Sequence, residues 1–274
     1  MKKSKVIVVT SGKGGVGKTT ISANIGTSLA LLGYDVCLID ADIGLKNLDL
    51  VLGLENRIVY TILDVVKGGK SPLEAVVKHK QLKKLNLLAS SQIANKDMIS
   101  PEDMKMIINE LSKHFDYIIV DSPAGIERGF KNAVVAAQHA IVVTTPELTA
   151  ISDADRVIGL LENEKYDEDS ISLIVNRVKL HMVNRNEMLS PEDIRSGLAV
   201  ELLGIVPDSE EIIIATNKGI PVTMEDESKI SKIFMNIAKR ISGEENPIEN
   251  DLALLKESSK TGFKGFLQKI FGGR

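Results

Sequence analysis

The most constraining feature of the chain is a glycine-rich segment near its start, with the sequence SGKGGVGKTT at residues 11–20. Gly12 to Thr19 fit the pattern G-x-x-x-x-G-K-[S/T], in which backbone N–H groups surround phosphates, the lysine reaches the terminal phosphates and the hydroxyl binds Mg²⁺. An apolar run precedes the segment and a helical pattern follows it, so the positive end of a helix dipole should face the anion. We therefore predict a phosphate-binding loop that holds a second cation, Lys13.

Short apolar runs alternate with helical patterns along the rest of the chain. The runs are apolar at consecutive positions, which is typical of strands covered on both faces. Their alternation with helices indicates crossover connections, so we expect an α/β fold in which a mainly parallel twisted sheet is flanked by helices in three layers. The expected strands are residues 6–9, 36–39, 85–88, 117–120, 141–143, 171–175 and 202–206. The expected helices are residues 18–32, 101–114, 130–138, 152–162 and 191–199.

Length and composition favour one large domain in a reducing compartment. The 274 residues are 43% apolar, which is enough to bury a large core. Cys37 is the one cysteine, so no disulfide can form within the chain, and a cytoplasmic location is expected. The start of the chain runs directly into a short strand and fits neither a signal peptide nor a membrane span.

Acidic residues follow two of the predicted strands. Asp40 and Asp42 end the run 36–39, and Asp121 ends the run 117–120. Ligands of parallel sheets collect at the carboxyl ends of strands, so these carboxylates should converge on the loop. Mg²⁺ prefers oxygen ligands and keeps water, so Thr19, a nucleotide and water-mediated carboxylates form a suitable shell. If strict alternation continues, Asp40 and Asp42 share a face, one holding metal-bound water and the other orienting an attacking water; spacing leaves open which does which.

Three segments together resemble the MinD/ParA family of deviant Walker A P-loop ATPases. They are residues 11–20, residues 39–49 with the sequence IDADIGLKNLD, and residues 120–127 with the sequence VDSPAGIE. The likeness extends over essentially the whole chain. It implies a P-loop NTPase fold, hydrolysis of ATP with Mg²⁺, and a homodimer in which two subunits enclose two ATP molecules. In that dimer the residue matching Lys13 reaches the partner's nucleotide, and as an unpaired lysine it would keep the two facing surfaces apart until nucleotide binds.

The resemblance also implies roles for individual residues. Lys18 would bind the terminal phosphates, and Asp42 would position the hydrolytic water, so Lys13, Lys18 and Asp42 form the expected catalytic set. Thr19 would bind Mg²⁺, which Asp40 and Asp121 support through water. The expected nucleotide contacts are Gly12, Lys13, Gly14, Gly15, Val16, Gly17, Lys18, Thr19, Thr20, Asn176, Pro207 and Asp208. Asp153 and Asp155 match a partner-docking helix, although they also suit an ordinary helix start.

The end of the chain has the pattern of a membrane-binding helix. Five bulky apolar residues recur at helical spacing on one stripe, with lysines off the stripe, which fits an interfacial amphipathic helix; they are Phe263, Phe266, Leu267, Ile270 and Phe271. From Ser258 onward the charged residues are three lysines and one arginine, which leave −7 on the rest of a chain of net charge −3. One copy should bind only marginally, whereas a dimer presents two. We expect an ATPase domain at 1–241, a C-terminal helix and linker at 242–261 and a membrane-targeting helix at 262–274. The alternative is that this helix packs on the protein itself or binds in a groove of a partner.

Taken together, these features predict an ATPase that moves between the cytoplasm and the cytoplasmic face of the cell membrane and places the division septum. The implied partners are an inhibitor matching MinC, a stimulator matching MinE and anionic lipids, with no sequence-specific nucleic acid. A flagellar-placement ATPase and a DNA-partition ATPase of the same family are the alternatives, the second disfavoured by the acidic body. A redox or iron–sulfur protein needs paired cysteines, which this chain lacks.

Overall fold

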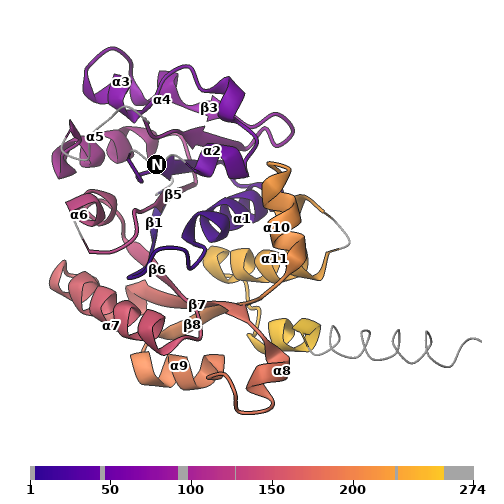
Figure 1. Ribbon diagram of the computed structural model, residues 1–274. Helices are drawn as coiled ribbons and strands as arrows, with labels where there is room; N and C mark the ends of the chain where they lie inside the picture. The colour runs from indigo at the N-terminus through magenta and orange to yellow at the C-terminus, as the bar shows by residue number, and fades with distance from the viewer. Residues whose placement is uncertain (1–3, 44–46, 92–97, 127, 226–227, 256–274) are drawn as a thin grey trace, which may run out of the picture.

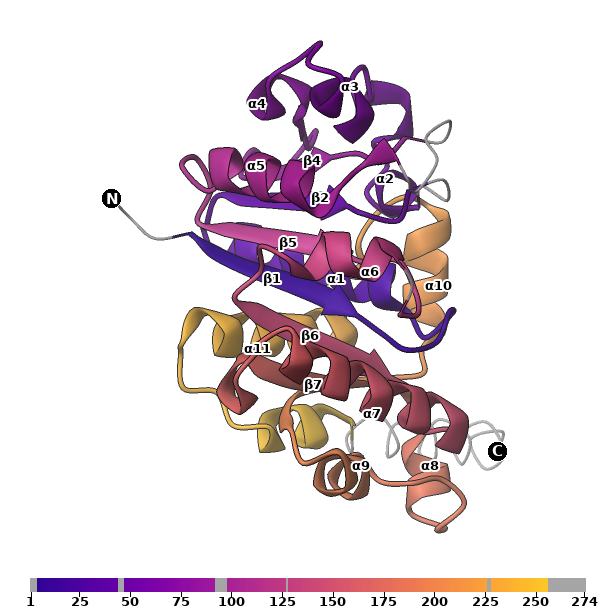
Figure 2. The same ribbon diagram turned by 90° about the vertical axis from the view of Figure 1, so that its left-hand side faces the viewer.

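A twisted, mainly parallel sheet forms the centre of the molecule (Figures 1 and 2). The computed structural model describes residues 4–43, 47–91, 98–126, 128–225 and 228–255, and in these residues the sheet has eight strands in the order β3-β4-β2-β5-β1-β6-β7-β8. All neighbours pair in parallel except β3, which is antiparallel to β4. The strands are β1 (Lys5–Thr10), β2 (Val36–Asp40), β3 (Val77–Lys78), β4 (Leu85–Leu88), β5 (Tyr117–Asp121), β6 (His139–Thr144), β7 (Ile171–Val178) and β8 (Glu201–Pro207).

The predicted fold class is confirmed, and each of the seven expected strands lies within an observed one. Their residues are almost fully buried because helices cover both faces of the sheet. The sequence analysis missed β3, whose two residues are too few to show a period of alternation. This strand leaves the β4 side of the sheet with a short antiparallel edge.

Helices cover the two faces of the sheet (Figure 1). One face carries α1 (Lys18–Leu31) and α11 (Lys229–Ser242), which pack on each other. The other carries α5 (Pro101–Leu111), α6 (Arg128–Val134) and α7 (Leu148–Asn163). The shorter helices are α2 (Leu48–Val51), α3 (Ile62–Val66), α4 (Pro72–Ala75), α8 (Leu180–Val183), α9 (Pro191–Leu198) and α10 (Glu210–Asn217).

Four of the five expected helices correspond closely to α1, α5, α7 and α9. The start signals of α5 and α9 act as predicted, because Ser100 and Ser190 each cap the helix through the aspartate three residues later. The expected helix at 130–138 ends earlier, since α6 stops at Val134 and the following residues form a turn. Helix α11 was missed although its buried residues have clear helical spacing, at Ile230, Ile233, Phe234, Ile237 and Ile241.

The last described residues pack on the body of the protein. Residues 249–255 are helical, and Asp251 forms a buried ion pair of 2.8 Å with Arg240 of α11. Leu255 is also buried. The described part of the expected linker therefore belongs to the body, while the five residues of the expected membrane-binding stripe, Phe263 to Phe271, lie outside the described residues. No helix in the described ranges has the length and apolarity that crossing a bilayer requires.

Candidate nucleotide and magnesium site

The predicted phosphate-binding loop connects β1 to α1, at the carboxyl edge of the sheet. Gly17 precedes the first helical residue, Lys18, with a φ of 100° that a side chain would strain. A Cβ atom at Gly12 would lie 2.1 Å from the backbone oxygen of Asp153, so the loop touches α7 directly. Open backbone N–H groups at the start of a 14-residue helix suit an anion. Of the loop residues, Gly14 and Gly15 are exposed, Gly12, Lys13, Gly17, Thr19 and Thr20 are half-buried, and Val16 and Lys18 are buried.

Two carboxylates lie side by side next to this loop. Asp40 and Asp121 are opposite each other in the register of β2 and β5, and each is 1% exposed. Burial, and then the nearby charge of Asp121, raises the pKa of Asp40 to about 8. Burial raises the pKa of Asp121 to about 6, while the Lys18 ammonium and hydrogen bonds from Thr19 and Ser22 act in the opposite direction. The Ser22 hydroxyl donates to Asp121 over 2.8 Å.

This arrangement fits Mg²⁺. Two buried carboxylates that disfavour each other's ionisation are stabilised by a cation, and oxygen ligands are the ones Mg²⁺ prefers. The Thr19 side chain lies close enough to Asp121 to lower the pKa of that carboxyl, which brings together the three residues expected to support the metal. Asp40 accepts backbone N–H groups of Asp42 and Leu48, at 3.0 and 3.3 Å, so its carboxylate is held in place.

Asp42 follows the end of β2 and lies beside the same carboxylates. Strand β2 ends at Asp40, and the Asp42 N–H turns back to donate to the Asp40 carboxylate. Strict alternation cannot be applied to Asp42, because the chain leaves the strand between the two residues, and a shared face for their side chains stays a prediction. The charge of Asp42 nevertheless raises the pKa of both Asp40 and Asp121, which shows that it is close to them.

Lys13 is not unpaired in the single chain. Its Nζ atom lies 3.5 Å from a carboxylate oxygen of Glu147 and 3.2 Å from the hydroxyl of Thr149, both at the start of α7. The sequence analysis expected Lys13 to be unpaired, and this contact corrects that expectation. The pair is weak, since the side chains of Lys13 and Glu147 are 42% and 62% exposed. Lys13 can therefore leave Glu147 at little cost.

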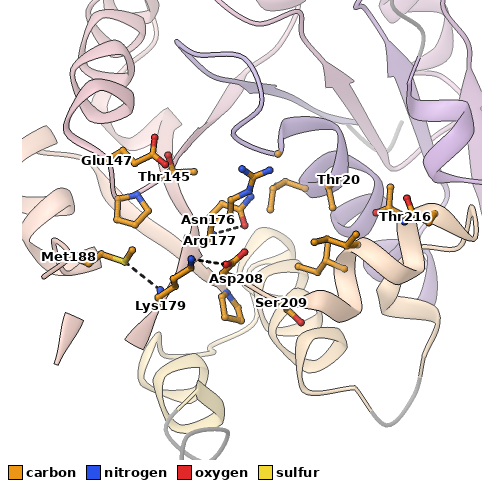
Figure 3. A pocket seen from close by; sticks show the side chains of 17 residues that line it. Thr20, Thr145, Glu147, Asn176, Arg177, Lys179, Met188, Asp208, Ser209 and Thr216 are labelled. Atoms are coloured by element: carbon orange, nitrogen blue, oxygen red, sulfur yellow. Dashed lines mark hydrogen bonds and ion pairs between the residues drawn. The ribbon is translucent and has the colours of Figure 1, made fainter. Parts of the chain in front are cut away.

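A cavity of about 540 Å³ adjoins the loop and reaches the ends of β6, β7 and β8 (Figure 3). Asn176, Pro207 and Asp208 line it, together with Gly17 and Thr20 of the phosphate region. The volume and the mixed lining suit a nucleoside. The expected base contacts are thus brought to one cavity beside the loop, although Asn176 lies about 30 residues before Pro207 and Asp208 in the sequence.

Asn176 also supports the loop. Its Nδ2 atom donates to the backbone oxygen of Val16 over 2.7 Å, and its Oδ1 atom accepts the N–H of Arg177 over 2.9 Å. An asparagine amide has two donor hydrogens and two acceptor lone pairs, so one of each remains for a base. Asn176 therefore joins the expected base region to the phosphate region.

The sequence analysis missed several lining residues. Lys179 and Asp208 form an ion pair of 3.3 Å at the cavity, and Arg177 has a φ of 58°, which is uncommon for a side chain of this size (Figure 3). Lys179, close after the end of β7, also donates its N–H to the Met188 sulfur over 3.4 Å. The sequence held one indication of these residues, which is their position. They lie in the segments after β6, β7 and β8, and all of these segments lie at the carboxyl edge of the sheet. Further lining residues are Thr145, Pro146, Ile212, Ile213 and Thr216.

The two acids expected to bind a partner lie on α7. Asp155 is exposed, whereas Asp153 is half-buried and lies 3.8 Å from Arg156. The backbone of Asp153 is the part that touches Gly12 of the loop. The helix surface that carries these acids is therefore in direct contact with the phosphate region.

A phosphate loop, strand-end carboxylates and a nucleoside-sized cavity in one continuous site place the protein among the P-loop nucleotide hydrolases. The comparisons with known proteins agree. The family model described as "ParA: NUBPL iron-transfer P-loop NTPase" matches residues 2–242. The chain is 62% identical over 268 residues to the septum site-determining protein MinD of Thermotoga maritima, covering 98% of this chain and 99% of that one. It is 48% identical over 271 residues to MinD of Bacillus subtilis, with coverage of 98% and 99%.

Solved structures give the same result. A MinC:MinD cell division protein complex from Aquifex aeolicus matches with a TM-score of 0.82 and 48% identity, covering 89% of this chain and 98% of that one. A MinD protein complexed with Mg-ADP from Pyrococcus horikoshii matches with a TM-score of 0.79 and 29% identity, with coverage of 87% and 96%. The chain belongs to the MinD/ParA family of P-loop ATPases. It is an ATPase, and its cofactors are ATP and Mg²⁺.

Proposed function

We propose that this ATPase dimerises with MgATP, binds the cytoplasmic face of the cell membrane through its C-terminal tail, and recruits a division inhibitor to place the septum. Hydrolysis stimulated by a second partner then releases it. The relatives that cover nearly the whole chain are named septum site-determining proteins, which favours this function over flagellar placement and DNA partition. Iron transfer, which the family description mentions, does not fit a chain whose single cysteine is buried.

The surface around Lys13 is the observation that carries the proposal. Gly14 and Gly15 are exposed, and so are two apolar side chains of segments that contact this loop, Ile126 at 53% and Leu148 at 75% exposure. Gly125, beside Ile126, donates its N–H to the Ser11 carbonyl, and Leu148 follows the Glu147 that holds Lys13. This face therefore combines a lysine that is easily released with apolar area next to the phosphate position. A second copy that docks here would bring its own Lys13 to the bound ATP.

Within each subunit we assign the chemistry to the residues already described. Lys18 neutralises the terminal phosphates, and Thr20 contacts the α-phosphate region. Thr19 would bind Mg²⁺, which Asp40 and Asp121 would support through water, and the ion would supply positive charge beside the phosphates. Asp42, next to both carboxylates, positions the attacking water. Asn176, Pro207 and Asp208 contact the base in the cavity.

The partners follow from α7 and from the tail. Asp153 and Asp155 would meet an inhibitor matching MinC and a stimulator matching MinE, and the contact of Asp153 with Gly12 joins that surface to the loop. The tail stripe from Phe263 to Phe271 would bind anionic lipids. Because two weak tails act together in a dimer, membrane affinity rises by roughly 100-fold when ATP pairs the subunits.

Light scattering and vesicle sedimentation in ATP and in ADP test the proposal. We expect a dimer, and sedimentation with anionic vesicles, in ATP only. An Asp42→Ala variant should remain dimeric in ATP, because it cannot hydrolyse the nucleotide. A chain without residues 262–274 should still dimerise but should not sediment. The same particle mass in ATP and in ADP, or equal sedimentation in the two nucleotides, would contradict the proposal.

A further inference from the structure

The β3 edge of the sheet carries an excess of positive charge. Residues 57–84 contain seven lysines or arginines and only two acidic residues, in a chain of net charge −3. They form the turn before α3, helices α3 and α4, and the β3–β4 hairpin, at the top of Figure 1. We call four exposed cations of this region the basic edge: Arg57, Lys78, Lys80 and Lys83.

The backbone holds these cations close together. Arg57 donates from its guanidinium to the carbonyl of Lys78 over 3.2 Å. The buried His79 accepts two N–H groups of the hairpin turn, from Gln81 at 3.3 Å and Leu82 at 3.1 Å, and so fixes the turn that presents Lys80 and Lys83. Burial lowers the pKa of His79, and the charges of Lys80 and Arg57 lower it further, which places both cations near its ring.

Among the residues that the structure describes, no carboxylate neutralises the basic edge. The neighbouring Lys70 and Lys84 form ion pairs, with Glu74 at 3.3 Å and Asp35 at 3.7 Å. In the described part of the chain the four cations of the basic edge form none. Like charges held together without partners repel one another, so their arrangement favours an external anion.

Protection of the sheet edge explains only part of this charge. A lysine on an exposed edge strand prevents pairing with another chain, and Lys78 fills that role on β3. Arg57 precedes α3, and Lys80 and Lys83 lie in the hairpin turn, outside the strand. Three of the four cations are therefore unexplained by edge protection.

We propose that the basic edge binds the anionic headgroups of a membrane surface. Val59, two residues from Arg57, is 75% exposed and adds an aliphatic side chain that suits the headgroup boundary. Lysines act on such a surface as mobile point charges, each worth about fivefold in partitioning. The two aromatic rings of residues 57–84 are not free for a nucleic-acid base to stack on, because His79 is buried and Tyr60 is half-buried with the Lys70 ammonium 4.7 Å from its ring centre. The inference extends the membrane association proposed above by adding a second contact, in the ATPase body.

Sedimentation of the full chain tests this contact. The test variant combines Lys78→Gln, Lys80→Gln and Lys83→Gln, and the control combines Lys105→Gln, Lys165→Gln and Lys232→Gln, three exposed lysines elsewhere with the same total charge. Binding is measured in ATP and in ADP to phosphatidylcholine vesicles with and without phosphatidylglycerol, and to duplex DNA. Thermal melting checks the fold, and Lys80→Gln alone serves if the triple variant unfolds.

We expect the test variant to partition onto phosphatidylglycerol vesicles at least about tenfold more weakly than the wild type, and the control within about twofold of it. Equal binding by the test variant, an equal loss in the control, or no binding of the wild type to anionic vesicles would overturn the inference. So would a loss confined to DNA, which would indicate a nucleic-acid surface. Equal sedimentation of the wild type in ATP and in ADP would instead contradict only the proposed dependence of membrane binding on ATP.

Discussion

Asn176, near the end of β7, donates a 2.7 Å hydrogen bond to the backbone oxygen of Val16 in the phosphate loop, 160 residues earlier in the chain. Val16 is 3% exposed, so its carbonyl would be unsatisfied without this donor. We expect Asn176→Ala to weaken MgADP binding about tenfold or more, as measured by titration calorimetry. Asn217→Ala, an exposed residue that lines the same cavity, is the control; equal losses would show that the loop contact is unimportant.

Substitutions at Lys13 and Lys18 should have different effects on nucleotide binding and on hydrolysis. Lys18→Ala removes the buried lysine that we assign to the terminal phosphates and should abolish nucleotide binding. Lys13→Ala breaks only an exposed pair with Glu147, so we expect nearly unchanged melting and nucleotide affinity. Phosphate release should nevertheless fall on the order of 10³-fold, as for loss of a cation supplied in trans. Hydrolysis by Lys13→Ala at the wild-type rate would refute the assigned role.

Gly12 should not tolerate a side chain. A Cβ atom there would lie 2.1 Å from the backbone oxygen of Asp153, and neither backbone can move without displacing the loop or α7. Gly12→Ala should therefore prevent nucleotide binding and lower the melting temperature. Gly14→Ala is the matched control, because its Cβ would meet nothing closer than Ala124 at 3.8 Å. If both variants bound nucleotide equally, close packing at Gly12 would not matter.

The Arg240–Asp251 pair should be important for stability. Its side chains are 12% and 0% exposed, and Arg240 also donates to the carbonyl of Leu203 over 2.8 Å. Asp251→Asn leaves a buried arginine without its counter-charge, which typically costs about 3–5 kcal/mol in the free energy of unfolding. Glu192→Gln breaks an exposed pair with Arg195 and should cost less than about 1 kcal/mol. Urea unfolding of both variants measures the difference.

His79 should make stability depend on pH. Its folded pKa lies below the ordinary 6.5, because burial disfavours the charged ring, so the unfolded chain binds this proton more readily. The stability it contributes is complete above about pH 6.5 and is lost as the pH falls through the lowered value. The stability advantage of the wild type over His79→Gln should therefore shrink between about pH 7.5 and 5.5 in urea titrations. A difference independent of pH would show that His79 does not titrate in this way.

The sequence predicted the elements that depend on local patterns. The loop glycines, the strand-end acids and the consecutive apolar runs are each readable within about ten residues, so the fold class and the seven main strands were predicted correctly. The two-residue strand β3 was missed because it is too short to show a period. Alternation could not be extended to Asp42, because β2 ends two residues earlier.

Contacts between distant residues were decided by the tertiary structure alone. The pairing of Lys13 with Glu147, the hydrogen bond from Asn176 to Val16 and the clustering of Arg57 with the β3 hairpin join segments that no local period relates. The crossover connections of the sheet bring the carboxyl ends of separate strands to one edge, and side-chain packing then selects the partners. The sequence by itself determined which chemical groups are present and which strands they follow. Only folding determined which of these groups touch, because that depends on strand order rather than on spacing along the chain.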